Sequence, residues 1–283
     1  MALIEFVDFS FRYVGSDSFA LRHIDLRIEQ GEFVVLTGPS GCGKTTLCRA
    51  MNGLVPHFHR GYVGGMVLVD GLDTRNHSVA QLASKVGIVF QNPANQLVTL
   101  NVEKEIAFGP ENLGVEPIEI RRRVDELISL LGLERLRGKH PHEMSGGEQQ
   151  SVAIASVLAL RPKILVADEP TSHLDPHSSE MVLDMIKRLN EQGMTVVLTE
   201  HRLDLVAGCA SRVILMNEGQ IVADGPPREV LCKDLCLELG IGVPKAMLVY
   251  RFLTEHGVRL PRAPLNSREL VSIMQEMLGH DSA

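Results

Sequence analysis

The spacing of apolar residues predicts an α/β fold: a mostly parallel core sheet, an antiparallel β subdomain at the N-terminus, a helical insert and a small α-helical C-terminal domain. Three observations lead to this fold class. Alternating apolar and polar residues open the chain, short apolar runs bounded by glycine recur through its middle, and helical periodicity alone remains after residue 225. The 283 residues, 45% of them hydrophobic, allow one large domain and an appendage.

The first elements alternate apolar and polar residues, as half-buried antiparallel strands do. The runs LIEFVDFSF and ALRHIDLRI show this alternation, and YVGGMVLVDG adds a further strand. In contrast, FVVLT (33–37) and KVGIVF (85–90) are apolar almost throughout, which is typical of strands buried in the middle of a sheet. A helix is expected from Lys44 to Met51.

Helical periodicity from Val102 onward predicts the insert, at about residues 101–158. Pro117 suits the first turn of a helix and Gly132 follows its end. The apolar face of that helix is formed by Ile120, Val124, Leu127, Ile128 and Leu131. The long apolar helix after MSGGEQ closes the insert.

Buried strands are expected again at ILVAD (164–168), TVVLTE (195–200) and RVILM (212–216). A helix before Gly193 carries an apolar stripe of Met181, Val182, Met185, Ile186 and Leu189. Strand, helix and strand with short links predict a right-handed parallel sheet, and NEGQIVADG predicts an edge hairpin. We therefore assign residues 1–225 to one domain and 226–283 to the helical C-terminal domain.

Composition excludes several classes of protein. A net charge of -7 argues against a nucleic-acid partner, and the basic run 121–123 is interpreted as a solvated helix face. No stretch reaches the roughly 18 apolar residues of a membrane span, and the start lacks the pattern of a signal peptide. The five cysteines form no C-x-x-C pair, so we expect free thiols and a cytoplasmic location.

The motif GPSGCGKT lies between a predicted strand and a predicted helix, which is the context of a phosphate-binding loop (P-loop). Its backbone N–H groups would surround phosphate oxygens, Lys44 would reach the β- and γ-phosphates, and the Thr45 hydroxyl would ligate Mg²⁺. The expected nucleotide-binding residues here are Gly38, Pro39, Ser40, Gly41, Cys42, Gly43, Lys44, Thr45 and Thr46. The motif predicts a P-loop NTPase.

Two carboxylates end the predicted strand ILVADEP. Ligands of parallel α/β sheets bind at the carboxyl ends of strands, so both should lie beside the P-loop. Asp168 suits Mg²⁺ coordination, and Glu169 suits the orientation or deprotonation of an attacking water. By contrast, His57, His59, His140 and His142 have no ligand spacing and are interpreted as solvated loop residues.

The set GPSGCGKT, MSGGEQ, ILVADEP, SHLD and TEH resembles the nucleotide-binding subunits of ABC transporters, over roughly residues 4–224. The segment QNPANQLVTLNVEKEIAFGPENLG and the tail LGIGVPKAMLVYRFLTEHGVRLP are similar to the ATPases of energy-coupling factor (ECF) uptake systems. The resemblance implies an ATPase with ATP as substrate and Mg²⁺ as cofactor.

The resemblance also implies roles for single residues. Tyr13 would stack on adenine, with Phe11 as the alternative. Gln91 would contact Mg²⁺ or the attacking water, and His201 would contact the γ-phosphate. Asp175, at the end of SHLD, would communicate across a dimer (the D-loop), although nothing explains His173 in that motif.

The stretch MSGGEQQ resembles the ABC signature, which acts on the nucleotide of another subunit. Its trans contacts would be Ser145, Gly146, Gly147 and Glu148. Glu148 stands where the family usually has glutamine, and Ser151 where arginine is common. A carboxylate near a γ-phosphate should weaken closure unless it points away.

As a member of this group, the protein would energise a membrane importer of a vitamin, a related precursor or a transition-metal ion. Its partners would be a second ATPase subunit, identical or different, a transmembrane ECF component and a substrate-binding membrane component. It would lie on the cytoplasmic face of the membrane as a peripheral protein. ATP would drive closure of the dimer.

Three other classes of protein are alternatives to a transporter ATPase. A P-loop kinase would not need MSGGEQ or His201. A soluble ABC ATPase acting with cytoplasmic partners usually carries two cassettes or a long coiled coil, and this chain has one P-loop. A regulatory subunit without hydrolysis would be expected to lose Glu169 or His201, and both are present.

Overall fold

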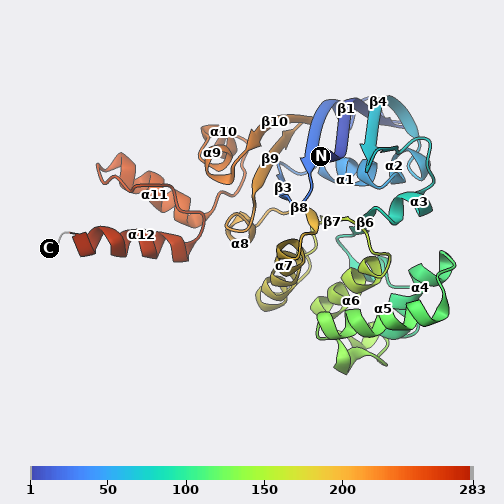
Figure 1. Cartoon of the computed structure of the whole chain (residues 1–283). Coiled ribbons are helices and arrows are strands. Elements are labelled where there is room, and N and C mark those ends of the chain that lie inside the picture. Colours follow the sequence, from blue (N-terminus) through green and yellow to red (C-terminus); the bar gives the residue numbers. More distant parts are fainter. Residues whose placement is uncertain (1, 281–283) are drawn as a thin grey trace.

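The computed structural model describes residues 2–280 and contains two sheets (Figure 1). The N-terminal sheet has four strands in the order β2-β1-β4-β5, and each strand is antiparallel to its neighbours. The strands span β1 (Ala2–Tyr13), β2 (Leu21–Glu29), β4 (Gly61–Val69) and β5 (Leu72–Asp73). The antiparallel subdomain predicted from alternation is confirmed.

The core sheet has six strands in the order β10-β9-β3-β8-β7-β6. All its pairs are parallel except β10 with β9, the edge hairpin that turns at 218–219 as predicted. The strands span β3 (Phe33–Thr37), β6 (Val86–Val89), β7 (Ile164–Asp168), β8 (Thr195–Thr199), β9 (Arg212–Asn217) and β10 (Gln220–Gly225). Every residue of β3, β7 and β8 is buried, which explains their continuous apolar runs.

The helices of residues 1–225 fall into three groups. Near the P-loop lie α1 (Lys44–Met51), α2 (Leu54–His57) and α3 (Val79–Ala83). The helical insert contains α4 (Val102–Asn112), α5 (Pro117–Leu130) and α6 (Gly146–Leu158), with the 3-10 turns η1 (Pro93–Asn95), η2 (Glu134–Leu136) and η3 (Pro141–Glu143) around it. The last group is α7 (Pro176–Glu191) and α8 (Leu203–Val206).

Apolar side chains pack on both faces of the core sheet. Alternate residues such as Val34 and Leu36 face the N-terminal sheet and α1, which lies between the two sheets. The residues that alternate with them, Phe33 and Val35, face the opposite side and pack with side chains of the insert and α7. Because β3, β8, β7 and β6 are neighbours and parallel, their carboxyl ends lie at the same edge of the core sheet. Segments that are distant in sequence therefore meet at this edge.

Two helix faces differ from the prediction. Met181 is 55% exposed, so it does not belong to the buried stripe of α7, whereas Val182 and Ile186 are buried as expected. Leu131 is only half-buried, because it follows the end of α5 as its C-cap. The other four residues predicted for the face of α5 are buried.

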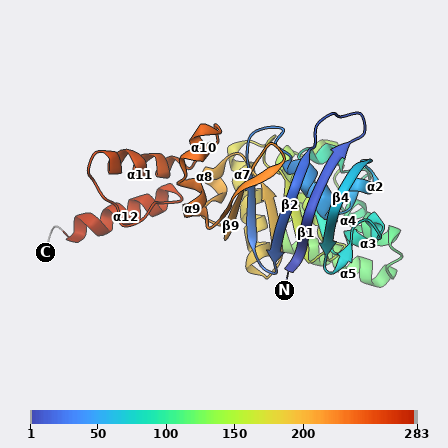
Figure 2. The ribbon, with the colours of Figure 1, turned by 90° about the horizontal axis from the view of Figure 1, so that it is seen from above.

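The C-terminal segment is helical, with α9 (Pro227–Leu231), α10 (Asp234–Glu238), α11 (Lys245–Glu255) and α12 (Ser267–His280). Leu231, Cys236 and Met247 join the apolar cluster of the core sheet, so the segment begins in contact with it. Beyond this, α11 and α12 lie side by side and project away from the sheets (Figures 1 and 2). Across the described residues we find no helix that is long and apolar enough to cross a membrane.

Candidate active site

The P-loop connects β3 to α1 and depends on glycine at close approaches. Gly38 and Gly43 have φ of 150° and 108°, in the region that favours glycine. A Cβ on Gly38 would lie 2.2 Å from the carbonyl oxygen of Met216, and one on Gly43 would lie 2.5 Å from that of Ala20. At Gly38 and Gly43, therefore, neighbouring backbone leaves no room for a side chain, whereas Gly41 meets nothing within 4 Å and has a φ of 78°.

Lys44 is the first residue of α1 and is only 5% exposed. Its Nζ donates to the carbonyl oxygens of Gly38 at 2.8 Å and Pro39 at 3.0 Å, so the ammonium lies across the loop. Burial raises the pKa of the Cys42 thiol, although the nearby lysine acts in the opposite direction. Cys42 is therefore a neutral thiol that packs in the loop and is not a reactive thiolate. The loop thus holds one cation at a helix start, the arrangement that binds phosphate.

Asp168 and Glu169 lie at the carboxyl end of β7, as predicted, but in different surroundings. Asp168 is 5% exposed and its Oδ1 accepts a hydrogen bond from Thr199 Oγ1 at 2.8 Å. The same hydroxyl oxygen accepts from the backbone N–H of Glu169 at 2.7 Å. Glu169 has φ of 49°, a left-handed conformation that is unfavourable for a non-glycine residue. Glu169 is half-buried, whereas the strand residues before it are buried.

Glu169 forms hydrogen bonds with two other residues for which the resemblance implies a role, His201 and Gln91. Its Oε1 lies 2.9 Å from His201 Nε2, and its Oε2 accepts from Gln91 Nε2 at 3.2 Å. An ionised carboxylate only accepts, so we assign the proton of that bond to His201 Nε2. Glu169, His201 and Gln91 therefore form one cluster, although His201 is 32 residues and Gln91 is 78 residues from Glu169 in sequence.

A cavity of about 460 Å³ joins the P-loop to this cluster. Its lining brings together predicted residues from both sheets: Tyr13, Ser40, Gly41, Gly43, Lys44, Thr45, Thr46, Gln91, Glu169 and His201, with Ala20. It has a cation and backbone N–H groups on one wall and a carboxylate on the other. This arrangement can bind a triphosphate and align a water against its end.

Tyr13 lies at the edge of this cavity, and its hydroxyl is 3.0 Å from Thr46 Oγ1. The alternative residue, Phe11, is fully buried and cannot contact a ligand.

Contrary to the interpretation as a solvated residue, His59 is half-buried and packs edge-on against the Tyr13 ring, with the two ring centroids 6.1 Å apart. Burial lowers the pKa of His59, so it is neutral at physiological pH. His57 lies in α2, with Nε2 2.7 Å from the carbonyl oxygen of Thr74.

The signature residues lie at the start of α6. Ser145 is the N-cap: its Oγ accepts from the N–H of Glu148 at 3.3 Å, and Glu148 Oε2 accepts from the N–H of Ser145 at 2.7 Å. Ser151 Oγ donates to the carbonyl oxygen of Gly147 at 2.9 Å. No signature residue is among the described residues that line the 460 Å³ cavity at the P-loop. Ser145 and Gly146 are exposed and free to contact another molecule.

Asp175 is the N-cap of α7 and accepts from the N–H of Ser178 at 3.0 Å. The bond from the Ser178 hydroxyl lowers the pKa of this carboxyl. His173 is exposed, and the structure gives no reason for a histidine there.

The residues expected to hold Mg²⁺ line a second cavity of about 510 Å³. Thr45, Gln91 and Asp168 supply a hydroxyl, an amide and a carboxylate, the hard oxygen donors that Mg²⁺ prefers. Within residues 2–280, no group of three or more histidine, cysteine or acidic side chains is arranged to hold a metal by itself. The donor set fits Mg²⁺, which commonly takes few protein ligands and completes its shell with phosphate and water.

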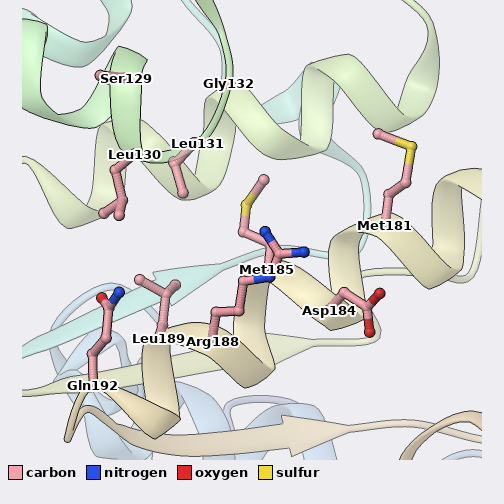
Figure 3. A pocket seen from close by; sticks show the side chains of 10 residues that line it. All are labelled: Ser129, Leu130, Leu131, Gly132, Met181, Asp184, Met185, Arg188, Leu189 and Gln192. Carbon is pink, nitrogen blue, oxygen red and sulfur yellow. The ribbon is translucent and has the colours of Figure 1, made fainter.

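A further cavity lies away from these residues. Figure 3 shows it between the end of α5 and the outer face of α7, with Leu130, Met181 and Met185 directed into it. Its volume is about 370 Å³. It contains none of the groups expected to bind phosphate and mixes leucine and methionine with polar side chains, so we do not assign it to the active site.

The profile of the ABC transporter family matches residues 21–172, more than half of the 283-residue chain. The chain belongs to the ABC transporter ATPase family. This ABC ATPase is 44% identical over 277 residues to the putative ABC transporter ATP-binding protein PH1815 of Pyrococcus horikoshii, with 97% of each chain covered.

The ABC ATPase is also 39% identical over 282 residues to the energy-coupling factor transporter ATP-binding protein EcfA1 of Clostridium perfringens, covering 97% of this chain and 98% of the relative. CbiO1 of Clostridium perfringens, part of the ABC transporter complex cbiONQ, matches with a TM-score of 0.72 and 31% identity, covering 84% of this chain and 96% of CbiO1. The cassette MJ0796, solved as a dimer with ADP and Pi, matches with a TM-score of 0.68 and 30% identity, covering 80% and 99%. The ABC ATPase is thus an ATP-binding subunit of the transporter class.

Proposed function

We propose that this ABC ATPase energises an ECF-type membrane importer of a vitamin, a related precursor or a transition-metal ion, through ATP-driven closure of an ATPase dimer. The main support for ATP hydrolysis is a single cavity that is lined by Lys44, Gln91, Glu169 and His201. The likeness to EcfA1 and CbiO1 supports the type of importer.

Each residue of the cavity has a role in this proposal. The P-loop amides and Lys44 bind the phosphates, and Tyr13 stacks on the base. Glu169 orients the attacking water, while His201 and Gln91 hold the Glu169 carboxylate from its two sides. Bound Mg²⁺, held by Thr45, Gln91 and Asp168, would neutralise charge on the phosphates. Most of the rate enhancement then comes from positioning and electrostatics.

The second half of the site comes from another subunit in this proposal. Ser145 and Gly147 at the start of α6 would cap the γ-phosphate bound to the P-loop of a second subunit, which is identical or different. The carboxylate of Glu148 is bonded back to the N–H of Ser145, at 2.7 Å. This bond fixes the carboxylate on a backbone N–H of its own helix start, where the positive end of the helix dipole offsets its charge, so the departure from glutamine need not weaken closure.

The segment after Gln91 would receive the transmembrane ECF component. Val98, Leu100 and Phe108 are large apolar side chains of this segment that are 65%, 63% and 45% exposed, so each offers apolar surface for such a contact. The buried carboxylate of Glu105 accepts from the N–H groups of Val98 and Thr99, which holds this loop in shape. The protein would accordingly lie at the cytoplasmic face of the membrane, in a complex that also contains a substrate-binding membrane component.

The helices α11 and α12 would add a dimer contact. Leu248, Phe252 and Val271 are 44%, 59% and 53% exposed on this projecting pair. Deleting the pair would also remove Met247 from the core, so we suggest Phe252→Asp instead. A weaker dimer by analytical ultracentrifugation supports the contact, and an unchanged dimer rejects it.

Glu169→Gln tests the catalytic proposal. The amide keeps the size of the side chain but cannot take a proton, so hydrolysis should fall by about two orders of magnitude or more while ATP still binds. An ATP-bound dimer should accumulate in gel filtration. Glu191→Gln, at an exposed position near the end of α7, is the matched control. Unchanged turnover in Glu169→Gln would refute the assigned role.

Co-purification from solubilised membranes tests the transport proposal. The full chain should be recovered with membrane-spanning subunits, and their identity would indicate the cargo class. Recovery with soluble partners alone would support the alternative, a soluble ABC ATPase that acts in the cytoplasm.

A further inference from the structure

Glu200 is a buried carboxylate next to the histidine of the active site. It follows the last residue of β8, is 3% exposed, and its N–H donates to the carbonyl oxygen of Leu36 in β3 at 3.3 Å. An ionised carboxylate is costly to bury unless its oxygens accept hydrogen bonds. The partners of this carboxylate therefore indicate what it is retained for.

One oxygen of Glu200 holds the loop that carries His201. Oε1 accepts from the backbone N–H groups of His201 and Arg202, each at 2.9 Å. These bonds fix the backbone at the point where the His201 side chain leaves it to meet Glu169 at 2.9 Å. The orientation of His201 thus depends on the position of the Glu200 carboxylate.

The other oxygen of Glu200 reaches the loop between β7 and α7. Oε2 accepts from the hydroxyl of Thr171, which is fully buried two residues after Glu169. Arg202 strengthens this link, because its Nη2 donates to the carbonyl oxygen of Thr171 at 2.9 Å and to Ser179 Oγ at 2.8 Å. The carboxylate is therefore shared between the loop of His201 and the loop that leads to the D-loop.

The same network continues into the first turn of α7. Ser179 Oγ donates to the carbonyl oxygen of Asp175 at 2.8 Å, and Asp175 caps the helix through Ser178. The start of α6 lies against this turn: a Cβ on Gly147 would come within 2.7 Å of Ser178 Cβ. A continuous set of bonds and contacts therefore joins the signature loop of a chain to its own catalytic histidine.

We propose that Glu200 is a positioning residue of the ATPase reaction: its carboxylate orients His201 toward Glu169 and ties that histidine to the D-loop and the start of α7. When a partner subunit closes over the signature and the D-loop of this chain, the network would carry that movement to His201 and Glu169 of this chain. This inference rests on the role given to His201 in the proposed function.

Glu200→Ala and Glu200→Gln in the full chain separate positioning from simple support of the fold. The glutamine can still accept from the two backbone N–H groups and hydrogen-bond the Thr171 hydroxyl, whereas alanine loses all three bonds. We expect Glu200→Ala to lower kcat by roughly 10- to 100-fold with KM for ATP within about threefold, because a small misplacement of a catalytic group has that effect. Glu200→Gln should restore kcat to within about threefold of the wild type.

Asp70→Ala is the matched control for a lost carboxylate. Asp70 accepts from Lys163 Nζ at 2.8 Å and pairs with Lys85 at 2.9 Å, away from the nucleotide cavity. It should lower the melting temperature without changing kcat at a temperature where the protein is folded. Loss of kcat in Asp70→Ala equal to that in Glu200→Ala would mean that kcat only reports stability, and would overturn the proposal.

A double-mutant cycle with His201→Ala decides whether Glu200 acts through the histidine. If it does, Glu200→Ala lowers kcat in the wild type but causes little further loss when His201 is already alanine. An equal loss in both backgrounds would overturn the proposal. If His201→Ala by itself leaves kcat unchanged, the proposed catalytic role of His201 fails instead, so the two failures are distinguishable.

Discussion

The contact between β6 and α6 offers a direct test of the packing that joins the helical insert to the core sheet. A Cβ placed on Gly87, in the middle of β6, would lie 2.1 Å from Cγ1 of Val157 and 3.2 Å from Cγ of Pro162. Val157 is 7% exposed on α6, and its branched side chain has few alternative rotamers in a helix. We therefore expect that Gly87→Ala cannot be accommodated without displacing α6 from the sheet.

The expected magnitude follows from this overlap. Overpacking a well-filled core by a methyl group costs about 1–3 kcal/mol of the free energy of unfolding. In a domain of this size each kcal/mol lowers the melting temperature by about 2–4 °C, so a cost near 2 kcal/mol corresponds to about 4–8 °C. Since β6 leads to Gln91 and α6 begins at the signature, the displacement should also lower ATPase activity.

Thermal unfolding followed by circular dichroism measures the effect on Gly87→Ala, Val157→Ala and the double variant. Val157→Ala alone should cost about 2 kcal/mol by removing buried methyl groups. In the double variant the new methyl occupies space that the valine has left, so its destabilisation should be smaller than the sum of the two by about 1 kcal/mol or more. Stability of Gly87→Ala within about 0.5 kcal/mol of the wild type, or strict additivity, would refute the reasoning.

Three further predictions concern the site and the insert. Tyr13→Ala should raise KM for ATP about tenfold, because base stacking is worth about 1–3 kcal/mol, whereas Tyr13→Phe should change it less than threefold; steady-state kinetics measure both. Glu148→Gln should leave kcat within about threefold, since the carboxylate is bonded to the N–H of Ser145; a large rise would show that its charge opposes closure. Hydrogen bonds from Arg123 and then Arg122 lower the pKa of Glu119 to about 2, so its contribution to stability is present above pH 4.5 and lost as the pH falls toward 2. Arg123→Ala should move that pKa upward in an NMR titration of the carboxyl carbon, and an unchanged pKa would contradict the assignment.

Much of this site could be predicted from the sequence because its parts are contiguous. The P-loop is one turn between a buried strand and a helix, and Gly38 and Gly43 stand where neighbouring backbone excludes a Cβ. The signature serine and Glu148 form a capping box within four residues of chain. Asp168 and Glu169 lie at a strand end, where parallel sheets expose polar groups. In each case neighbouring residues determine the local conformation.

Other features depend on which elements pack together, and no local pattern contains that information. Glu200 looks like one polar residue at a strand end, and its role becomes visible only because β7 and β8 are adjacent and place Thr171 beside it. The half-buried position of His59 depends on its contact with Tyr13, which joins the loop after α2 to β1, and its spacing in the sequence does not reveal that contact. The exposure of Met181 depends on how α5 approaches α7, which helical periodicity does not specify.

The amino-acid sequence by itself thus determined the class of chemistry, the order of the strands and helices, and the residues proposed to bind phosphate, since these follow from short-range backbone geometry and hydrophobic periodicity. The tertiary structure decided which side chains hold the proposed catalytic residues in place. Those contacts join segments separated by tens of residues, as with Gln91 and Glu169, which are 78 residues apart. They exist only because folding brings the ends of several strands to one edge of the core sheet.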